Sequence, residues 1–171
     1  DVAAMAALGY STVSCHPFPK VVVFSSGDEL VEIDQFPSFG KIRDANRYAI
    51  AALIKESGAE ALFHEKLPDN LDHTIERLSF ASRSGANIVI TTGGVSVGDK
   101  DFIKPAIEHL GSLELWRVAM RPGKPLAFGM IGDTLVFGLP GNPVSAQVTF
   151  ELFVRPVIRK WMGNKRLHRQ K

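Results

Sequence analysis

The sequence has one cysteine, Cys15, in 171 residues. A single cysteine cannot form a disulfide within the chain, and it excludes a cysteine-based zinc site. Because disulfides belong to oxidising compartments, this composition favours a reducing, cytoplasmic setting. The sequence also lacks the run of roughly 18 apolar residues that a transmembrane helix needs, and it lacks a signal-peptide signature. We therefore expect no association with a membrane.

The chain has no large excess of charge of one sign. It carries 20 Lys and Arg residues against 18 Asp and Glu residues. The small positive excess lies near the C-terminus, at Lys165, Arg166, Arg169 and Lys171. A nucleic-acid-binding surface needs a basic face rather than a basic end. The charge distribution therefore argues against a nucleic-acid partner.

Several catalytic signatures are absent. Ser25 and Ser26 lie in no G-x-S-x-G turn, so a nucleophilic serine is unsupported. The dipeptide Gly123-Lys124 lacks the upstream glycine and the Ser or Thr of a P-loop. The five histidines show no spacing typical of metal ligands. Serine hydrolases, P-loop nucleotidases and histidine-based zinc enzymes are all disfavoured.

The composition predicts one compact domain. Hydrophobic residues make up 45% of the chain, and a chain of this length buries about 70% of the surface that it exposes when unfolded. Residues 1–9 resemble the end of a helix stopped by Gly9, and the first residue is Asp1 rather than Met. We expect residues 1–19 to be a linker from a preceding domain, residues 20–163 to be the domain, and residues 164–171 to be a tail towards a further domain.

The most informative stretch is residues 87–104. A β-branched apolar run from Asn87 to Thr92 predicts a buried strand, which ends at Gly93-Gly94. A helix pattern follows from Asp101. Backbone N–H groups of such a glycine loop bind phosphate, and the acids Asp99 and Asp101 indicate a Mg²⁺ ion that shares the phosphate. The alternative is that the glycines only allow a turn and that Asp101 only caps the helix.

The remaining pattern alternates strands with helices. Strands are predicted at residues 21–26, 59–67, 113–120, 126–128 and 134–139. One helix is expected from Asp44 to Gly58, with the apolar face Ala45, Tyr48, Ala49, Ala52 and Leu53. Another is expected after Pro68, capped by Asp69 or Asn70, and a last one from Pro143. The last helix is apolar nearly all round, so we expect burial on more than one side and a kink at Pro156.

This order predicts a three-layer α/β fold, in which a mostly parallel, mixed sheet has helices on both faces. Ligands of such sheets bind beyond the carboxyl ends of the strands. The side chains and glycines expected at that edge are Ser26, Gly27, Asp28, Glu29, Asp69, Thr92, Gly93, Gly94, Ser96, Asp99, Asp101, Arg121, Lys124, Pro140, Gly141, Asn142 and Ser145. Acidic and glycine-rich loops together predict a site for a phosphorylated ligand with a metal. Asp69 and Asn142 could alternatively serve only as helix caps.

Five motifs carry a resemblance to a known family. They are S-S-G-D-E-L (25–30), K-I-R-D-A-N-R (41–47), T-G-G-V-S-V-G-D-K-D (92–101), R-P-G-K-P-L-A-F-G (121–129) and G-L-P-G-N-P-V-S-A (138–146). In this order they resemble the central domain of molybdopterin molybdenumtransferases, over about residues 1–165. The resemblance implies the molybdopterin-binding fold. It also implies insertion of molybdenum from molybdate into adenylylated molybdopterin, with Mg²⁺ and release of AMP.

The resemblance also implies roles for single residues. Glu29, Asp69 and Asp101 match acidic positions around the metal and the ligand, and Asp28 and Asp99 are nearby candidates. Arg117 and Arg121 stand where many family members have lysine. A guanidinium keeps the charge but does not donate a proton at neutral pH. Lys124 is an expected phosphate or molybdate contact. Expected partners are a second copy of the protein and a molybdopterin adenylyltransferase.

Two other functions fit the same resemblance. The first is a molybdopterin adenylyltransferase, which would act on molybdopterin and ATP and release pyrophosphate. The second is a non-catalytic scaffold, since eukaryotic relatives also cluster membrane receptors. The helix expected at residues 1–9 argues against the first, and nothing in the sequence favours the second.

Overall fold

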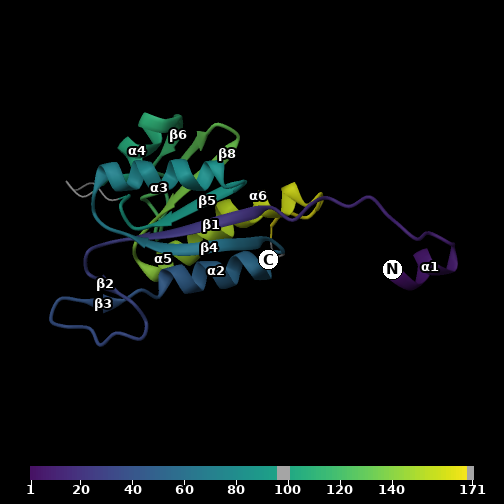
Figure 1. The fold of residues 1–171 in the computed structure, drawn as a ribbon, viewed down its shortest axis with the longest axis horizontal. Helices are drawn as coiled ribbons and strands as arrows, with labels where there is room; N and C mark the ends of the chain where they lie inside the picture. The colour runs from purple at the N-terminus through teal and green to yellow at the C-terminus, as the bar shows by residue number, and fades with distance from the viewer. Residues whose placement is uncertain (96–100, 169–171) are drawn as a thin grey trace.

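The computed structural model describes residues 1–95 and 101–168. Their main feature is a six-stranded sheet with the strand order β4-β1-β5-β8-β7-β6 (Figure 1). Strands β4, β1, β5 and β8 are parallel, whereas β7 runs antiparallel to both β8 and β6. The mixed, mostly parallel sheet predicted from the sequence is confirmed. The strands are β1 (Lys20–Ser26), β4 (Glu60–Leu67), β5 (Ile88–Thr92), β6 (Ser112–Trp116), β7 (Ala127–Ile131) and β8 (Thr134–Leu139).

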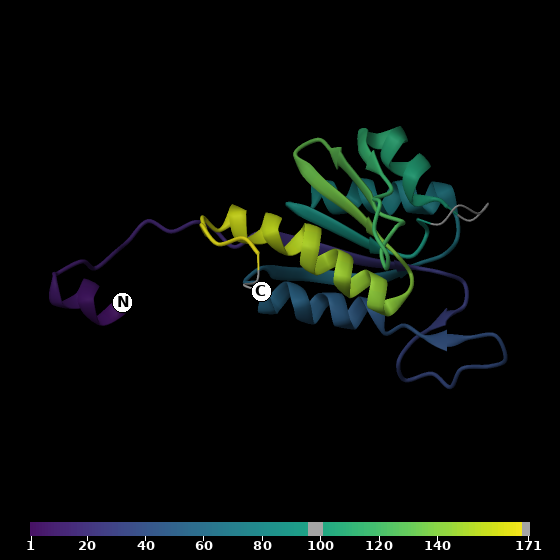
Figure 2. The same ribbon diagram turned by 180° about the vertical axis from the view of Figure 1, so that it is seen from behind.

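Helices cover both faces of this sheet, which gives the predicted three layers (Figures 1 and 2). One face carries α3 (Leu71–Arg83) and α4 (Ile103–Leu110). The opposite face carries α2 (Asn46–Glu56), α5 (Pro143–Thr149), a π-helical turn η1 (Phe150–Val154) and α6 (Arg155–Trp161).

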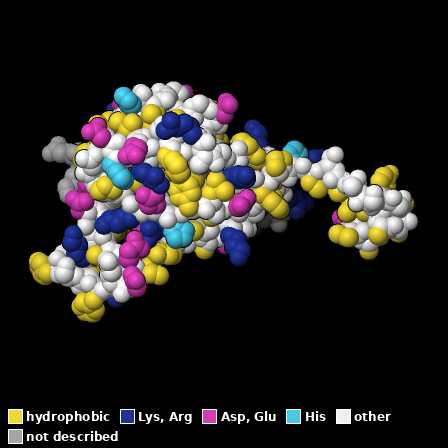
Figure 3. Space-filling view, in the orientation of Figure 1, with side chains coloured by type: hydrophobic (Ala, Val, Ile, Leu, Met, Phe, Trp, Pro, Cys, Tyr) yellow, Lys and Arg dark blue, Asp and Glu magenta, His cyan; other side chains and the backbone are white. Residues whose placement is uncertain are grey.

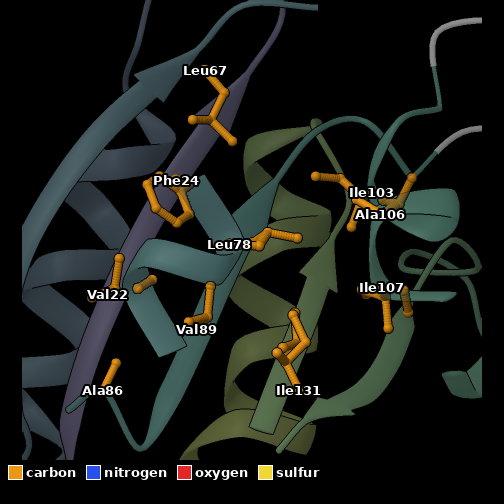
Figure 4. Packing of buried hydrophobic residues seen from close by; sticks show 14 residues of the cluster. Val22, Phe24, Leu67, Leu78, Ala86, Val89, Ile103, Ala106, Ile107 and Ile131 are labelled. Atoms are coloured by element: carbon orange, nitrogen blue, oxygen red, sulfur yellow. The ribbon is translucent and has the colours of Figure 1, made fainter. Parts of the chain in front are cut away.

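Each face of the sheet has its own hydrophobic core. Alternate residues of a strand point to opposite faces, so Val22 and Phe24 of β1 pack with α3 and α4, as Figure 4 shows. Val21 and Val23 pack with α2 and α5 instead. All four side chains are fully buried. Complete burial of a side chain of this kind contributes about 1.5–3 kcal/mol, which explains the unbroken apolar run in β1.

The buried face of α2 differs from the predicted one. Arg47, Ile50 and Ile54 are buried, whereas Ala45 and Ala52 of the expected apolar face are exposed. The prediction was wrong because it placed an arginine outside the core. In the structure Arg47 has two carboxylate partners, which compensate for its burial.

Two further predictions need correction. The strand expected at residues 113–120 stops at Trp116, because Arg117 has φ 75°, a left-handed conformation that interrupts the extended backbone of a strand. The last helix is buried on one side only, since Val144 and Leu152 are 64% and 49% exposed. The irregularity expected at Pro156 takes the form of η1, which lies directly before it in the chain.

A small lobe lies beside the main sheet, in a segment for which the sequence predicted no strand. This β2–β3 lobe, residues 28–43, contains the parallel strands β2 (Leu30–Val31) and β3 (Ile42–Arg43). Phe36 and Phe39 at its tip are 91% and 105% exposed. Figure 3 shows hydrophobic side chains on the lobe and on the N-terminal segment, residues 1–18.

The first 18 residues lead away from the sheet and include the short helix α1 (Val2–Ala7), which has no buried residue (Figures 1 and 2). Gly9, with φ 77°, follows the end of this helix as expected. Within the described ranges, the helices are too short or too polar to cross a membrane.

Candidate functional site at the carboxyl ends of the parallel strands

The four parallel strands end at one level of the sheet. Ser26 is paired with Leu67, and Thr92 is paired with both Ser25 and Leu139. The loops that follow β1, β4, β5 and β8 therefore leave the sheet along one edge. This is the edge at which open α/β sheets bind their ligands.

A cavity of about 460 Å³ lies along this edge. Eleven residues predicted from the sequence line it: Ser26, Gly27, Glu29, Asp69, Thr92, Gly93, Gly94, Pro140, Gly141, Asn142 and Ser145. They come from the ends of four different strands and their loops. The expectation that the acidic and glycine-rich loops meet at one edge is thus met by Glu29 and Asp69.

The loops after β1 and β4 are joined through Asp69. Its Oδ1 accepts a hydrogen bond from Ser26 Oγ at 3.0 Å. Its Oδ2 lies 3.4 Å from the backbone N of Asp28, and the Asp69 backbone N lies 3.4 Å from Asp28 Oδ1. Asn70, rather than Asp69, caps α3, because its side chain accepts from the backbone N of His73. Asp69 is therefore not needed as a helix cap.

Glu29 lies against the turn that follows β1. Gly27 has φ 147°, and a Cβ at this position would come within 2.6 Å of Glu29 Oε2. A side chain at position 27 would displace the Glu29 carboxylate, and the positive φ itself favours glycine. The sequence S-S-G-D-E-L thus places a second carboxylate at the cavity.

The glycine pair after β5 lies at the centre of the cavity wall. Gly93 and Gly94 have φ 84° and 66°, and a Cβ on Gly93 would clash with the carbonyl oxygen of Ser26. The Gly93 backbone N donates to Leu139 O of β8 at 3.1 Å. Beside the pair, Thr92 is 2% exposed, and its Oγ1 has no hydrogen-bond partner among the residues that the structure describes. This hydroxyl is therefore a buried donor without a partner, in a residue of the cavity wall.

The loop after β8 closes another side of the cavity. Asn142 Oδ1 accepts from the backbone N of Val144 at 3.1 Å and of Ser145 at 3.2 Å. Pro143 is the first residue of α5, as predicted. Asn142 therefore caps the helix and lines the cavity at the same time.

Five predicted site residues do not line the cavity: Asp28, Asp101, Arg117, Arg121 and Lys124. Asp28 lies beside Asp69, as described above. Asp101 lies shortly before α4 in the chain, and Arg117, Arg121 and Lys124 lie in the segment between β6 and β7. The three basic side chains are exposed. Two other predicted residues, Ser96 and Asp99, lie outside the described residues.

Asp101 lies in a partly buried position near the glycine loop. Its Oδ1 accepts from the backbone N of Lys104 at 3.3 Å, and the neighbouring Ile103 packs against Gly94. Burial raises the pKa of the Asp101 carboxyl above its usual range. The backbone N–H groups and the charges of Lys104 and Arg117 oppose this rise. The charge of Arg117 thus acts on Asp101.

The cavity also has lining residues that sequence reasoning missed: Leu30, Ile42, Asn46, Val95 and Pro125. Leu30, Ile42 and Asn46 reach the cavity because β2 pairs with β3 and brings residues 41–47 beside the strand ends. The motif K-I-R-D-A-N-R, which contains Ile42 and Asn46, was the only feature of the sequence that pointed to these lining residues. Its position relative to the strand ends depends on the β2–β3 lobe, which was not predicted.

Two carboxylates of the cavity, those of Glu29 and Asp69, are candidate ligands for Mg²⁺. Among the residues that the structure describes, no three His, Cys, Asp or Glu side chains gather closely enough to hold a metal ion by themselves. Glu29 and Asp69 nevertheless both line the cavity. Mg²⁺ commonly takes one or two carboxylates and completes its shell with phosphate oxygens and water. The donors present fit an ion that is shared with a phosphorylated ligand.

The fold and this cavity define a class of protein: a three-layer α/β domain with a cavity at the strand ends that is lined by acidic residues and glycines. A family model described as "Probable molybdopterin binding domain" matches residues 22–160. The chain belongs to this molybdopterin-binding domain family. The resemblance inferred from the motifs is confirmed.

Curated relatives agree with this assignment. The chain is 44% identical over 161 residues to a molybdopterin molybdenumtransferase from Haemophilus influenzae. This alignment covers 94% of this chain and 40% of the relative. It is 36% identical over 192 residues to gephyrin from Dictyostelium discoideum, which covers 95% of this chain and 26% of the relative. The chain thus spans well under half the length of these relatives.

Solved structures share the fold. A molybdopterin biosynthesis MoeA protein from Pyrococcus horikoshii has a TM-score of 0.85 at 32% identity, over 96% of this chain and 40% of that one. A molybdopterin biosynthesis enzyme MoaB from Thermus thermophilus has a TM-score of 0.66 at 24% identity, over 86% of this chain and 98% of that one. The second likeness concerns the fold alone.

Proposed function

We propose that this chain is the ligand-binding and catalytic part of a molybdopterin molybdenumtransferase. The reaction transfers molybdenum from molybdate to adenylylated molybdopterin and releases AMP. One observation carries the proposal: the carboxylates of Glu29 and Asp69 and the glycine pair Gly93-Gly94 line the same cavity at the strand ends. The carboxylates suit a divalent cation, and the glycine loop at the strand end suits a phosphate that shares this cation.

The residues of the cavity have distinct tasks in this proposal. Backbone N–H groups of the glycine loop and the Thr92 hydroxyl bind phosphate oxygens of the ligand. Glu29 and Asp69 hold Mg²⁺, which neutralises charge on the phosphates when it is bound. Asn142 fixes the start of α5 and with it the wall beside the ligand. Binding and orientation, rather than a covalent intermediate, supply the catalysis.

The basic residues outside the cavity complete the proposed site. Arg117, Arg121 and Lys124 screen the charge of molybdate and of the departing nucleotide. An arginine remains protonated at neutral pH, so Arg117 and Arg121 bind oxyanions and do not transfer a proton. Asp101 accepts a hydrogen bond from the Lys104 backbone N and is acted on by the charge of Arg117. Ser96 and Asp99 belong to the same proposed site.

We also propose a second copy of the protein and a molybdopterin adenylyltransferase as partners. The cytoplasm is the proposed setting, which fits an exposed free thiol at Cys15. The relatives' greater length leaves room for contributions from other domains to the reaction.

Product analysis tests the proposed function. The protein is incubated with adenylylated molybdopterin and Mg²⁺, with and without molybdate, and AMP is measured. AMP release that requires molybdate supports the proposal. Pyrophosphate from molybdopterin and ATP identifies an adenylyltransferase and overturns it. The absence of both products, together with no measurable AMP binding, also overturns it and leaves the scaffold function.

A further inference from the structure

Three side chains at the start of α2 contact three segments that each supply lining residues to the cavity: β1, the β2–β3 lobe and the loop after β8. Asp44 Oδ2 accepts from Ser25 Oγ of β1 at 2.5 Å. Asn46 Nδ2 donates to the carbonyl oxygen of Gly141, in the loop after β8, at 2.7 Å. Arg47 Nη2 donates to Glu32 Oε2 of the β2–β3 lobe at 2.5 Å.

Most of this group is buried. Ser25, Asp44 and Arg47 are 0%, 1% and 5% exposed, and Arg47 Nε lies 3.2 Å from Asp44 Oδ2. A buried guanidinium that loses one partner leaves an uncompensated charge, so these contacts tolerate little displacement. Burial lowers the pKa of Arg47, but the hydrogen bond to Glu32 and the charges of Asp44 and Glu32 outweigh it and raise this pKa. Arg47 therefore stays charged.

The β2–β3 lobe depends on such polar contacts because it has no apolar core. No residue between positions 28 and 43 is buried. Besides the ion pair with Arg47, a hydrogen bond from Lys66 Nζ to Leu30 O at 2.7 Å joins the lobe to β4. The lobe nevertheless supplies Glu29, Leu30 and Ile42 to the cavity. Displacement of the lobe would therefore move a proposed metal ligand.

We propose that Asp44, Asn46 and Arg47 are positioning residues that set the width of the cavity. Arg47 acts through Glu32 and holds the β2–β3 lobe. Asn46 holds the Gly141 loop, and Asp44 ties both contacts to the end of β1. The identity of the ligand in this inference rests on the proposed function, whereas the mechanical connection does not.

The first test breaks the connection to the lobe. Glu32→Gln removes the charge of a side chain that is 42% exposed and leaves Asp44, the other partner of Arg47, in place. The thermal midpoint is expected to fall, because the buried guanidinium of Arg47 loses one partner. Amide hydrogen exchange is expected to become faster in residues 28–43 than in the rest of the domain. Mg²⁺-dependent AMP affinity is expected to fall roughly three- to tenfold, in line with loss of a charge-assisted contact. Added NaCl is expected to speed exchange of the lobe in the wild type more than in the variant.

A matched control is available on the other side of β4. Glu65→Gln breaks the pair between Glu65 and Arg77 of α3, whose glutamate is 36% exposed. Neither Glu65 nor Arg77 lines the cavity. The control is expected to leave both the lobe exchange and the AMP affinity unchanged.

The second test breaks the connection to the loop after β8. Asn46→Ala is expected to speed exchange in residues 140–145 and to leave residues 28–43 unchanged. Glu32→Gln is expected to give the reverse pattern. Equal exchange changes throughout the domain in both variants, or no local change in either, would overturn the inference. If the wild type binds no AMP, the proposed function fails, and the two exchange patterns still decide this inference.

Discussion

Ser26 Oγ and Asp69 Oδ1 are joined by a hydrogen bond of 3.0 Å. The two residues are 43 positions apart in the chain. Ser26 is the last residue of β1, and Asp69 lies just after the end of the adjacent parallel strand β4. The bond holds one oxygen of the Asp69 carboxylate towards β1, at the wall of the cavity. The position of this carboxylate is therefore set by the sheet rather than by a flexible loop.

Loss of the Asp69 charge should weaken ligand binding without unfolding the domain. Asp69→Asn keeps the size of the side chain but removes a proposed Mg²⁺ ligand. We expect AMP affinity in the presence of Mg²⁺ to fall by about tenfold or more, as measured by calorimetry. Asp72→Asn, at an exposed position in the first turn of α3, is the control. Equal affinities of the two variants would show that Asp69 is no ligand of the metal.

Glycine at position 93 should be required for stability. Gly93→Ala combines a left-handed conformation with a clash at the Ser26 carbonyl. We expect a loss of about 2–3 kcal/mol of unfolding free energy in urea. Gly85→Ala is the control, because Gly85 has nearly the same φ, 85°, and open space around it. That variant should lose only about 1 kcal/mol. Similar losses in both would exclude the clash as a cause.

Two helix-capping residues, Asn142 and Asn70, allow an effect on stability to be distinguished from an effect on ligand binding. Asn142→Ala and Asn70→Ala each remove a side chain that accepts from backbone N–H groups. Both should cost about 1 kcal/mol of unfolding free energy. Only Asn142 lines the cavity, so only its variant should lose AMP affinity beyond the effect of stability. Loss of affinity in both variants, in proportion to stability, would reduce Asn142 to a structural cap.

The raised pKa of Asp101 predicts a dependence of stability on pH. Burial disfavours the charged carboxyl, so the folded state binds this proton more tightly than the unfolded state. This group therefore stabilises the fold below its unfolded pKa of about 3.9, and the contribution is lost as the pH rises through the folded pKa. Asp101→Asn keeps an acceptor for the Lys104 N–H and should be more stable than the wild type at pH 7.

The thermal midpoints of the wild type and of Asp101→Asn are measured between pH 7 and pH 4. The difference between the two midpoints should shrink as the pH falls, because the wild-type carboxyl becomes neutral. A difference that stays constant over this range would contradict the assigned effect of burial.

The sequence was most informative where the pattern is local. The run Val21–Phe24 requires burial on both faces, and the glycines at 93 and 94 require a turn directly after a strand. Parallel strands bring the loops after them to one edge, so much of the cavity lining could be predicted. Asn142 and Pro143 likewise predicted the start of α5 to the residue.

The missing parts depend on contacts between distant segments. Arg47 is buried only because Glu32 and Asp44 lie beside it, and no periodicity reveals that pairing. The β2–β3 lobe has no apolar alternation long enough to predict strands of two residues each. Leu30, Ile42 and Asn46 therefore could not be placed at the cavity from the sequence.

Calorimetric titration of AMP with and without Mg²⁺ tests the central claim most directly. The cavity at the strand ends should bind AMP in the presence of Mg²⁺, and removal of the ion with a chelator should weaken binding by at least about tenfold, because two carboxylates then face the phosphate without a cation. Molybdate added to the Mg²⁺ sample should change the measured affinity. Binding of equal strength with and without Mg²⁺ would contradict the account.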